Sequence, residues 1–160
     1  MLRRAIKMMK EDISYGVVPV RKVNESFEVL LCKSRRHGYF NLAKGHKDPG
    51  ETEIQGAIRE LLEETGHRPL RFWADSEWTY DYDQAVQIEP IDYYYKTSNE
   101  RTVHKTVKLY IAEVEKESEI LDLDEVEQVE WFPANEETAS LLHFKENIQH
   151  FIDCVLPKLS

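Results

Sequence analysis

The stretch GHKDPGETEIQGAIRELLEETGH, from Gly45 to His67, combines clear helix signals with a high density of charge. Thr52 followed by Gln55 forms a capping box, so a helix is expected to begin near Glu53. Gly66 readily adopts the left-handed conformation that ends many helices. The sequence therefore predicts one helix between these two signals, entered through a glycine-containing loop.

The two faces of this predicted helix carry different side chains. Apolar residues at helical spacing form a stripe that would be buried, made of Ile54, Ala57, Ile58 and Leu61. Glu60, Glu63 and Glu64 share the other face, where like charges at this spacing repel one another. Arg59 lies one turn before Glu63 and can reach its carboxylate. This face is either a solvated acidic surface with one ion pair or a site that needs clustered carboxylates.

The loop before the helix favours a site. Gly45 and Gly50 lie at its two ends, and the basic side chains of Lys44, His46 and Lys47 lie in or beside it. Mg²⁺ in proteins is commonly shared between a few carboxylates and the phosphate groups of a substrate. Acids suited to a metal ion beside bases suited to an anion indicate a site for phosphate chemistry.

The complete spacing resembles the Nudix box, the signature of the Nudix hydrolases. Five residues separate Gly45 from Glu51, seven more precede Arg59, and the segment continues as RELLEETG to Gly66. The last position of the pattern is usually a bulky aliphatic residue, and here it is His67, which would weaken a packing contact. The resemblance implies an α/β (α+β) fold, an α/β/α sandwich with a mixed central β-sheet.

The same resemblance implies a role for each charged position. The carboxylates of Glu60, Glu63 and Glu64 would hold Mg²⁺ or Mn²⁺, and one of them could take a proton from the attacking water. Arg59 would orient these glutamates, and Gly45 would let the backbone approach the metal. The implied reaction is metal-dependent hydrolysis at a phosphorus of a nucleoside diphosphate that is linked to another group.

Nudix hydrolases also carry an acid outside the box, in the loop before a late strand. The segment LDLDEVEQVEWF offers four candidates, which are Asp122, Asp124, Glu125 and Glu127. Counting back six positions from Trp131 reaches Glu125, which resembles the family position best and is predicted as a metal and catalytic residue. A solvated acidic turn remains the alternative for each of these side chains.

Within the family, AKGHKDPGE (Ala43–Glu51) resembles the entrance of the asymmetrically cleaving diadenosine tetraphosphate hydrolases, although Ala43 replaces a usual proline. The resemblance implies cleavage of diadenosine tetraphosphate to ATP and AMP. The enzymatic alternatives are RNA 5′-pyrophosphate removal, clearance of damaged nucleoside triphosphates and diphosphoinositol phosphate cleavage. A catalytically inactive, nucleotide-sensing domain is a further alternative, against which the intact set of acids argues.

Four residues are candidates for contact with such a substrate. Lys44 and His46 lie inside the motif and are expected to meet phosphate oxygens. Tyr82 and Phe144 match positions of the subfamily whose aromatic rings stack on an adenine. Tyr93–Tyr95 is a second possible stacking surface, with sheet packing as its alternative.

Hydrophobic periodicity predicts the remaining elements. Strands are expected over Ile13–Val20, Phe27–Lys33, Phe40–Leu42, Leu70–Tyr82, Thr106–Val114 and Val126–Phe132. An amphipathic helix is expected over Leu141–Leu156, which would make Phe144 a core residue. Alternation in the fourth strand would bury Tyr82 in the same way. Asp83–Lys105 is either a functional excursion or a β-hairpin with solvated tips.

The length of 160 residues suits one domain, expected over residues 13–160 after a basic N-terminal extension, residues 1–12. The formal net charge of −9 disfavours non-specific binding to nucleic acid and argues mildly against RNA as substrate. The two cysteines, Cys32 and Cys154, are expected to be reduced core thiols of a cytoplasmic protein. No apolar run has the length of a membrane span. The expected partner is a small nucleotide, with the chain acting as a monomer or dimer.

Overall fold

A long first strand, β1, runs through the centre of this computed structural model, which describes residues 9–159. The elements are β1 Lys10–Val23, β2 Ser26–Ser34, β3 Phe40–Asn41, β4 Lys44–Gly45, α2 Glu53–Thr65, β5 His67–Trp73, β6 Trp78–Thr79, η1 Tyr82–Gln84, β7 Ile91–Lys96, β8 Thr102–Lys116, β9 Val126–Pro133, α3 Glu136–Ala139, α4 Glu146–His150, η2 Phe151–Val155 and η3 Leu156–Lys158. Strand β1 begins at Lys10, earlier than the sequence predicts. Most of the predicted extension, residues 1–8, lies outside the described residues.

The strands form one mixed sheet. Their order is β3-β2-β1-β8-β5-β6, and β4, β7 and β9 pair with β1, β8 and β2 respectively. Strands β1 and β8 run parallel over most of the length of β1, whereas the other pairs are antiparallel. This arrangement confirms the expected mixed central sheet.

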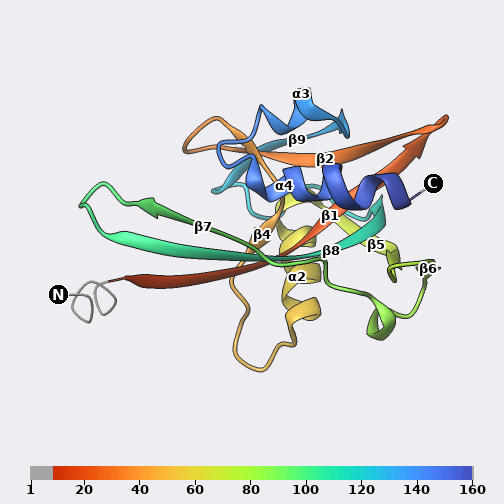
Figure 1. Ribbon diagram of the computed structural model, residues 1–160, viewed down its shortest axis with the longest axis horizontal. Coiled ribbons are helices and arrows are strands. Elements are labelled where there is room, and N and C mark those ends of the chain that lie inside the picture. The colour runs from red at the N-terminus through yellow and green to blue at the C-terminus, as the bar shows by residue number, and fades with distance from the viewer. Residues whose placement is uncertain (1–8, 160) are drawn as a thin grey trace.

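Helices cover both faces of the sheet (Figure 1). Successive side chains of β1 point to opposite faces, so Val17 packs in the cluster that contains Leu61 of α2, and Val18 packs in the cluster that contains Phe151. Leu61 and Phe151 are both fully buried. The carboxylate-bearing helix and the C-terminal segment therefore stabilise the sheet from opposite sides.

The local signals around the motif are confirmed. Thr52 caps α2 by accepting a hydrogen bond from the backbone N–H of Gln55, and the Gln55 side chain accepts from the backbone N–H of Thr52. Gly66 ends the helix with a φ of 71°. The backbone oxygen of Ser118 lies close to Gly66, so the Cβ atom of any other residue at position 66 would collide with that oxygen.

Two predicted elements differ in extent. The C-terminal helix begins at Glu146 rather than Leu141 and changes to π-helical winding at Phe151, although Ile148 and Phe151 are buried as expected. The chain over Leu70–Tyr82 forms strands only to Trp73 and over Trp78–Thr79, which leaves Tyr82 44% exposed instead of buried. Cys154 is also exposed and is not a core thiol.

The excursion from Asp83 to Lys105 is largely a β-hairpin, which was one of its two predicted forms. Strand β7 pairs antiparallel with β8, with Lys96 opposite Thr102. Together with the start of β1, this hairpin projects from one end of the molecule (Figure 1). No helix among residues 9–159 is long and apolar enough to cross a membrane.

Candidate active site

Gly45 and the helix α2 approach each other closely at the centre of the motif. Short strand β4 pairs with β1, with Gly45 opposite Tyr15, and this pairing places the glycine against the helix. A Cβ atom on Gly45 would overlap the carboxyl group of Glu60. The glycine is therefore required by lack of space, and its role here is to admit a carboxylate.

Arg59 ties the helix to the loop. Its Nε donates to Glu51 at 2.9 Å, and its Nη2 donates to the backbone oxygen of His46 at 2.8 Å. Its Nη1 donates to Glu60 Oε1 and Glu63 Oε2, both at 3.1 Å. The hydrogen bond to Glu51, followed by the charges of Glu60 and Glu63, raises the pKa of Arg59 above its ordinary value. This one guanidinium thus holds three carboxylates in a fixed relation to the loop.

Glu64 faces a different neighbour. Its Oε2 accepts a hydrogen bond from the backbone N–H of Lys44 at 3.0 Å. Burial, assisted by the negative charge of Glu60, raises the pKa of Glu64 to about 8. Burial also raises the pKa of Glu60. At Glu60 and Glu64, burial and the nearby acids thus outweigh the cations among residues 9–159, and a cation bound there would favour the charged carboxylates.

The loop before β9 is fastened beside these carboxylates. Asp122 donates its backbone N–H to the Glu63 backbone oxygen at 2.9 Å. Arg35 donates its side-chain Nε to the oxygen of Leu123 at 2.7 Å and its backbone N–H to the oxygen of Glu125 at 2.9 Å. The structure therefore places the predicted residue Glu125 at the motif, although the two are far apart in sequence.

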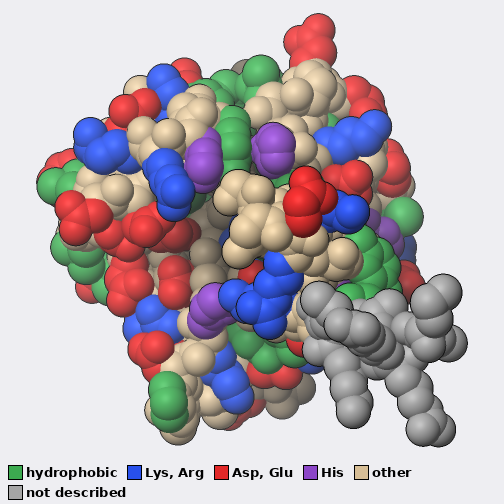
Figure 2. All heavy atoms as spheres, turned by 90° about the vertical axis from the view of Figure 1, so that its left-hand side faces the viewer, with side chains coloured by type: hydrophobic (Ala, Val, Ile, Leu, Met, Phe, Trp, Pro, Cys, Tyr) green, Lys and Arg blue, Asp and Glu red, His purple; other side chains and the backbone are tan. Residues whose placement is uncertain are grey.

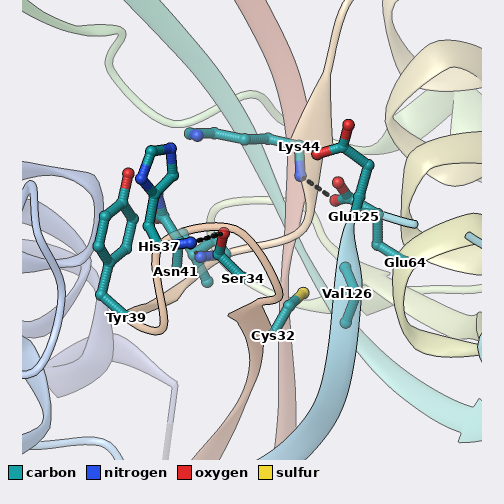
Figure 3. Close-up of a pocket in the computed structure, with 10 residues that line it drawn as sticks. Cys32, Ser34, His37, Tyr39, Asn41, Lys44, Glu64, Glu125 and Val126 are labelled. Carbon is teal, nitrogen blue, oxygen red and sulfur yellow. Dashed lines mark hydrogen bonds between the residues drawn. The ribbon is translucent and has the colours of Figure 1, made fainter. Parts of the chain in front are cut away.

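Two acids of this loop reach the cluster. Glu125 lines the same cavity as Glu64 (Figure 3). The negative charge of Asp122 contributes to the raised pKa values of both Glu60 and Glu64, so it also lies nearby. Of the four candidate acids of this segment, the sequence resemblance favoured Glu125, and the structure brings Asp122 to the site as well.

The cavity beside Glu64 has a volume of about 250 Å³. It is lined by Cys32, Ser34, His37, Tyr39, Asn41, Leu42, Lys44, Glu64, Glu125 and Val126. Acids lie on one side of it and His37 and Tyr39 on the other, with the Lys44 side chain extending between them (Figure 3). The cavity therefore combines acidic, basic and aromatic side chains.

The donor set fits Mg²⁺ or Mn²⁺ in kind, because these ions prefer carboxylate oxygens. The side chains are not arranged for coordination, however, since no three His, Cys, Asp or Glu side chains in residues 9–159 are placed to hold a metal ion. Arg59 instead engages oxygens of Glu60 and Glu63.

A continuous row of aromatic rings leads away from the cavity. His37 stacks on Tyr39 with ring centroids 5.2 Å apart, and Tyr39 stacks on His143 at 4.7 Å. His143 meets Phe144 edge to face at 4.5 Å, and Phe144 stacks on Tyr93 at 4.6 Å. Phe144 is therefore part of an aromatic row between the cavity and the hairpin, and it precedes the helix instead of lying on its core face.

The structure does not bring Tyr82 to this row. Tyr82 opens the short helix η1, which contacts β5, whereas Phe144 lies against Tyr93 of the hairpin strand β7. The chain around η1 and the tip of the hairpin lie toward opposite ends of the molecule (Figure 1). The expected pair of rings is thus separated, and the stacking partner of Phe144 is Tyr93.

Lys44 and His46 flank Gly45 on the loop. Burial, together with the nearby charge of Lys105, lowers the pKa of Lys44. The side chain of His46 is 69% exposed, and its Nε2 lies 2.5 Å from Asp12 Oδ1. Figure 2 shows the end of the molecule that is on the left in Figure 1, where histidine, basic and acidic side chains surround a hollow.

His67 occupies the motif position that is usually aliphatic, and it is nevertheless buried. Its Nδ1 lies 2.8 Å from the backbone oxygen of Thr65, and its ring packs edge to face against Trp131 at 6.1 Å. The expected loss of a packing contact is therefore offset by an aromatic contact with β9.

Several residues of this region were not predicted from the sequence, namely Asp12, Tyr39, His143 and Lys105. The first belongs to the segment assigned to the extension, and the others lie in loops or strands whose partners are distant in sequence. The available signal for Lys105 was its position two residues from both Val103 and Val107, which places it on the same strand face as these apolar side chains.

The fold and the arginine-bound carboxylates define a hydrolase family, and comparison with known proteins agrees. The NUDIX domain family matches residues 11–153, so the chain belongs to this family. The match includes Glu11 and Asp12, which sequence analysis placed in the extension.

Among curated proteins, the chain is similar to a Mycobacterium tuberculosis protein named "Putative mutator protein MutT4", with 37% identity over 73% of the chain and 42% of that protein. It is similar to the mouse asymmetrical bis(5′-nucleosyl)-tetraphosphatase, with 30% identity over 77% of the chain and 75% of that enzyme. The chain thus spans less than half of the first relative and three quarters of the second.

Among solved structures, the chain resembles an Ap4A hydrolase of C. elegans in a binary complex. The TM-score is 0.56 with 23% identity, over 81% of this chain and 85% of that one. It also resembles a MutT NUDIX hydrolase from Burkholderia pseudomallei, with a TM-score of 0.57 and 22% identity over 78% and 84% of the two chains. These likenesses establish the fold.

Proposed function

We propose that this NUDIX protein is a metal-dependent hydrolase of dinucleoside polyphosphates, and that it cleaves diadenosine tetraphosphate to ATP and AMP. The observation that carries the proposal is the joining of two features at one cavity. One is the group of acids arranged around Arg59 and Glu64, and the other is the aromatic row that starts at His37 and ends at Tyr93.

The acids would hold the metal. Glu60, Glu63 and Glu64, with Glu125 from the loop before β9 and the backbone of Gly45, are the proposed ligands. Mg²⁺ or Mn²⁺ bound there would supply positive charge to phosphate oxygens and make a water molecule more acidic. In the structure the guanidinium of Arg59 already neutralises part of this charge, which explains how the helix tolerates the repulsion.

The hydrolysis joins a water oxygen to phosphorus and breaks one bridging P–O bond of the polyphosphate. A proton leaves the water, and a carboxylate of the cluster accepts it. The leaving phosphate takes the electrons of the broken bond, so AMP and ATP separate as anions. Lys44 and His46 would hold the phosphate chain, because both flank the glycine that faces Glu60.

The aromatic row would hold a base. Phe144 packs against Tyr93, His143 and Tyr95 but is only partly buried, so part of its ring surface is accessible for stacking. An adenine stacked here would lie at the far side of the cavity from the acids, as the two ends of a dinucleoside polyphosphate require. The similarity to the mouse tetraphosphatase supports the same substrate.

A second candidate is clearance of damaged nucleoside triphosphates. This candidate is favoured by the 37% identity to the Mycobacterium tuberculosis protein named "Putative mutator protein MutT4". Such a substrate would use the same acids and the same water attack, and would differ in the base and the length of the phosphate chain.

The test is product analysis by ion-exchange chromatography after incubation with Mg²⁺ or Mn²⁺. The panel contains diadenosine tetraphosphate, triphosphorylated and capped RNA, diphosphoinositol phosphates and oxidised nucleoside triphosphates. We expect the highest kcat/KM for diadenosine tetraphosphate, with ATP and AMP in equal amounts. A higher kcat/KM for an oxidised triphosphate would transfer the assignment to the second candidate.

Two variants connect the activity to the cluster. Glu63→Gln and Glu64→Gln are each expected to lower kcat by at least about a hundredfold while the protein stays folded. Glu53→Gln, at the other end of the same helix and paired with Lys108 at 3.3 Å, is the matched control and should retain activity. Full activity of both cluster variants would refute the metal-site assignment.

A further inference from the structure

Asp12 links two basic side chains that belong to different parts of the chain. Its Oδ2 accepts a hydrogen bond from Lys105 Nζ at 2.9 Å, and its Oδ1 lies 2.5 Å from His46 Nε2. The two oxygens of one carboxylate are thus shared between a strand residue and a residue of the glycine-containing loop. The side chain of Asp12 is only 14% exposed.

The sheet places these groups by register. Asp12 lies directly opposite Lys105 in the parallel pair of β1 and β8. Ser14 follows on the same face of β1 and accepts a second hydrogen bond from Lys105 Nζ at 2.5 Å. Further along β1, Gly16 lies opposite Lys44, which directs the loop carrying His46 back toward Asp12.

Asp12 is held more firmly than an exposed acid would be. Lys105 is 8% exposed, so its ammonium depends on Asp12 and Ser14 for partners. Burial acts to raise the pKa of Asp12, but the hydrogen bonds to Lys105 and His46 lower it overall, which keeps the carboxylate charged. A fixed anionic acceptor therefore meets an imidazole that is otherwise largely exposed.

We propose that Asp12 is a positioning residue that holds His46 in the orientation required to bind the phosphate chain of the substrate. The inference rests on the proposed function for the nature of the substrate. With Nε2–H donating to Asp12, Nδ1 is the nitrogen of His46 for which the described residues supply no hydrogen-bond partner. When the ring carries both protons, Nδ1–H donates to a phosphate oxygen of the substrate. Lys105 acts by fixing Asp12.

The kinetic test uses diadenosine tetraphosphate with Mg²⁺. Asp12→Asn keeps the size of the side chain but removes the charge that orders the imidazole. We expect KM to rise roughly tenfold with kcat changed by less than about threefold, because the lost contact binds the ground and transition states alike. In a His46→Ala background, the same Asp12→Asn change should leave KM unaltered, since no imidazole remains to be positioned.

Two controls separate positioning from general damage. Glu11→Gln alters the neighbouring residue of β1, whose side chain pairs with His104 at 2.8 Å, and it should leave KM unchanged. Asp12→Asn could fold poorly because it leaves Lys105 without a charged partner. In that case the double variant Asp12→Asn/Lys105→Met is used instead of Asp12→Asn, both with His46 present and in the His46→Ala background. An equal rise of KM with and without His46, or no rise in either, would overturn the proposal.

A spectroscopic measurement is independent of activity. Long-range ¹H–¹⁵N NMR spectra at alkaline pH, where histidine is neutral, should show His46 of the wild type with its proton on Nε2. Asp12→Asn should weaken this preference, and Glu11→Gln should preserve it. An unchanged tautomer in Asp12→Asn would refute the positioning role, whereas absence of hydrolysis by the wild type would refute only the proposed function.

Discussion

Gly45 and Glu60 face each other so closely that the carboxyl group of Glu60 occupies the space of a side chain at position 45. The glycine lies in β4 and the glutamate in α2, so this contact sets the distance between the loop and the helix. Arg59 secures the contact by donating to Glu60 and to the backbone of His46. The geometry of the candidate site therefore depends on a missing side chain as well as on the charged ones.

Gly45→Ala should displace the Glu60 carboxylate and lower kcat/KM by roughly a hundredfold, since small misplacements of reacting groups have effects of this size. Gly56→Ala is the matched control, because the nearest atoms to its added Cβ lie at 3.4 Å, an ordinary contact distance. That helical substitution should raise the free energy of unfolding by up to about 1 kcal/mol and preserve activity. Steady-state kinetics and thermal melts test both; wild-type activity of Gly45→Ala would contradict the steric argument.

The raised pKa of Glu64 predicts how stability depends on pH in the presence of EDTA. Folding raises this pKa from its ordinary value of 4.5 to about 8, so the native state binds more protons than the unfolded state between these values. The contribution of Glu64 to stability should therefore fall as pH rises through this window and level off above it. Glu64→Gln should remove this contribution, which urea titrations at several pH values can measure. If the stability of Glu64→Gln depends on pH in the same way as that of the wild type, Glu64 is not the source of this pH dependence.

Mg²⁺ or Mn²⁺ should raise the melting temperature, because a ligand that binds only the native state stabilises it by about 2.7 kcal/mol at a hundred times its Kd. Chelation with EDTA should abolish hydrolysis. Glu63→Gln should shrink the metal-induced shift in melting temperature, and Glu53→Gln should leave it intact. Hydrolysis that survives EDTA, with melting indifferent to both ions, would exclude the proposed mechanism.

Phe144 and Tyr82 make different contacts, so substitutions at the two positions should have different effects on KM. Phe144→Ala removes the ring stacked on Tyr93 and should raise KM for diadenosine tetraphosphate roughly tenfold, the effect of one lost base stack. Tyr82→Ala tests the role that the sequence resemblance assigned to that ring, and we expect a smaller change because η1 lies away from the aromatic row. The effects should fall mainly on KM. A large effect of Tyr82→Ala alone would move the base-binding surface to η1.

The local part of the motif was readable from the sequence. The capping box at Thr52 and the end at Gly66 depend on residues within one turn of each other, so their spacing alone specifies the helix boundaries. The placement of Glu60, Glu63 and Glu64 follows from helical periodicity in the same way. The family pattern also named Glu125, which the structure places at the cavity.

The predictions of secondary structure were wrong where the ends of an element depend on packing against distant segments. Alternation predicted a strand through Tyr82, but pairing with β5 ends at Trp78 and Thr79, and the next residues turn into solvent. The C-terminal helix has the predicted buried face but begins later, because Leu142 forms a bridge with Phe40 of β3 before the helix starts. Such contacts are made by distant segments and leave no local signal.

The sequence by itself determined the helix, its caps, the cluster of acids on one face and the family to which they belong, because these depend on neighbours along the chain. Only the tertiary structure decided which distant groups surround that cluster. It brought Phe144 against Tyr93. It also paired Asp12 with Lys105, two residues that are 93 positions apart in the sequence. The physical reason is that sheet register and the packing of segments across it are set by the whole chain.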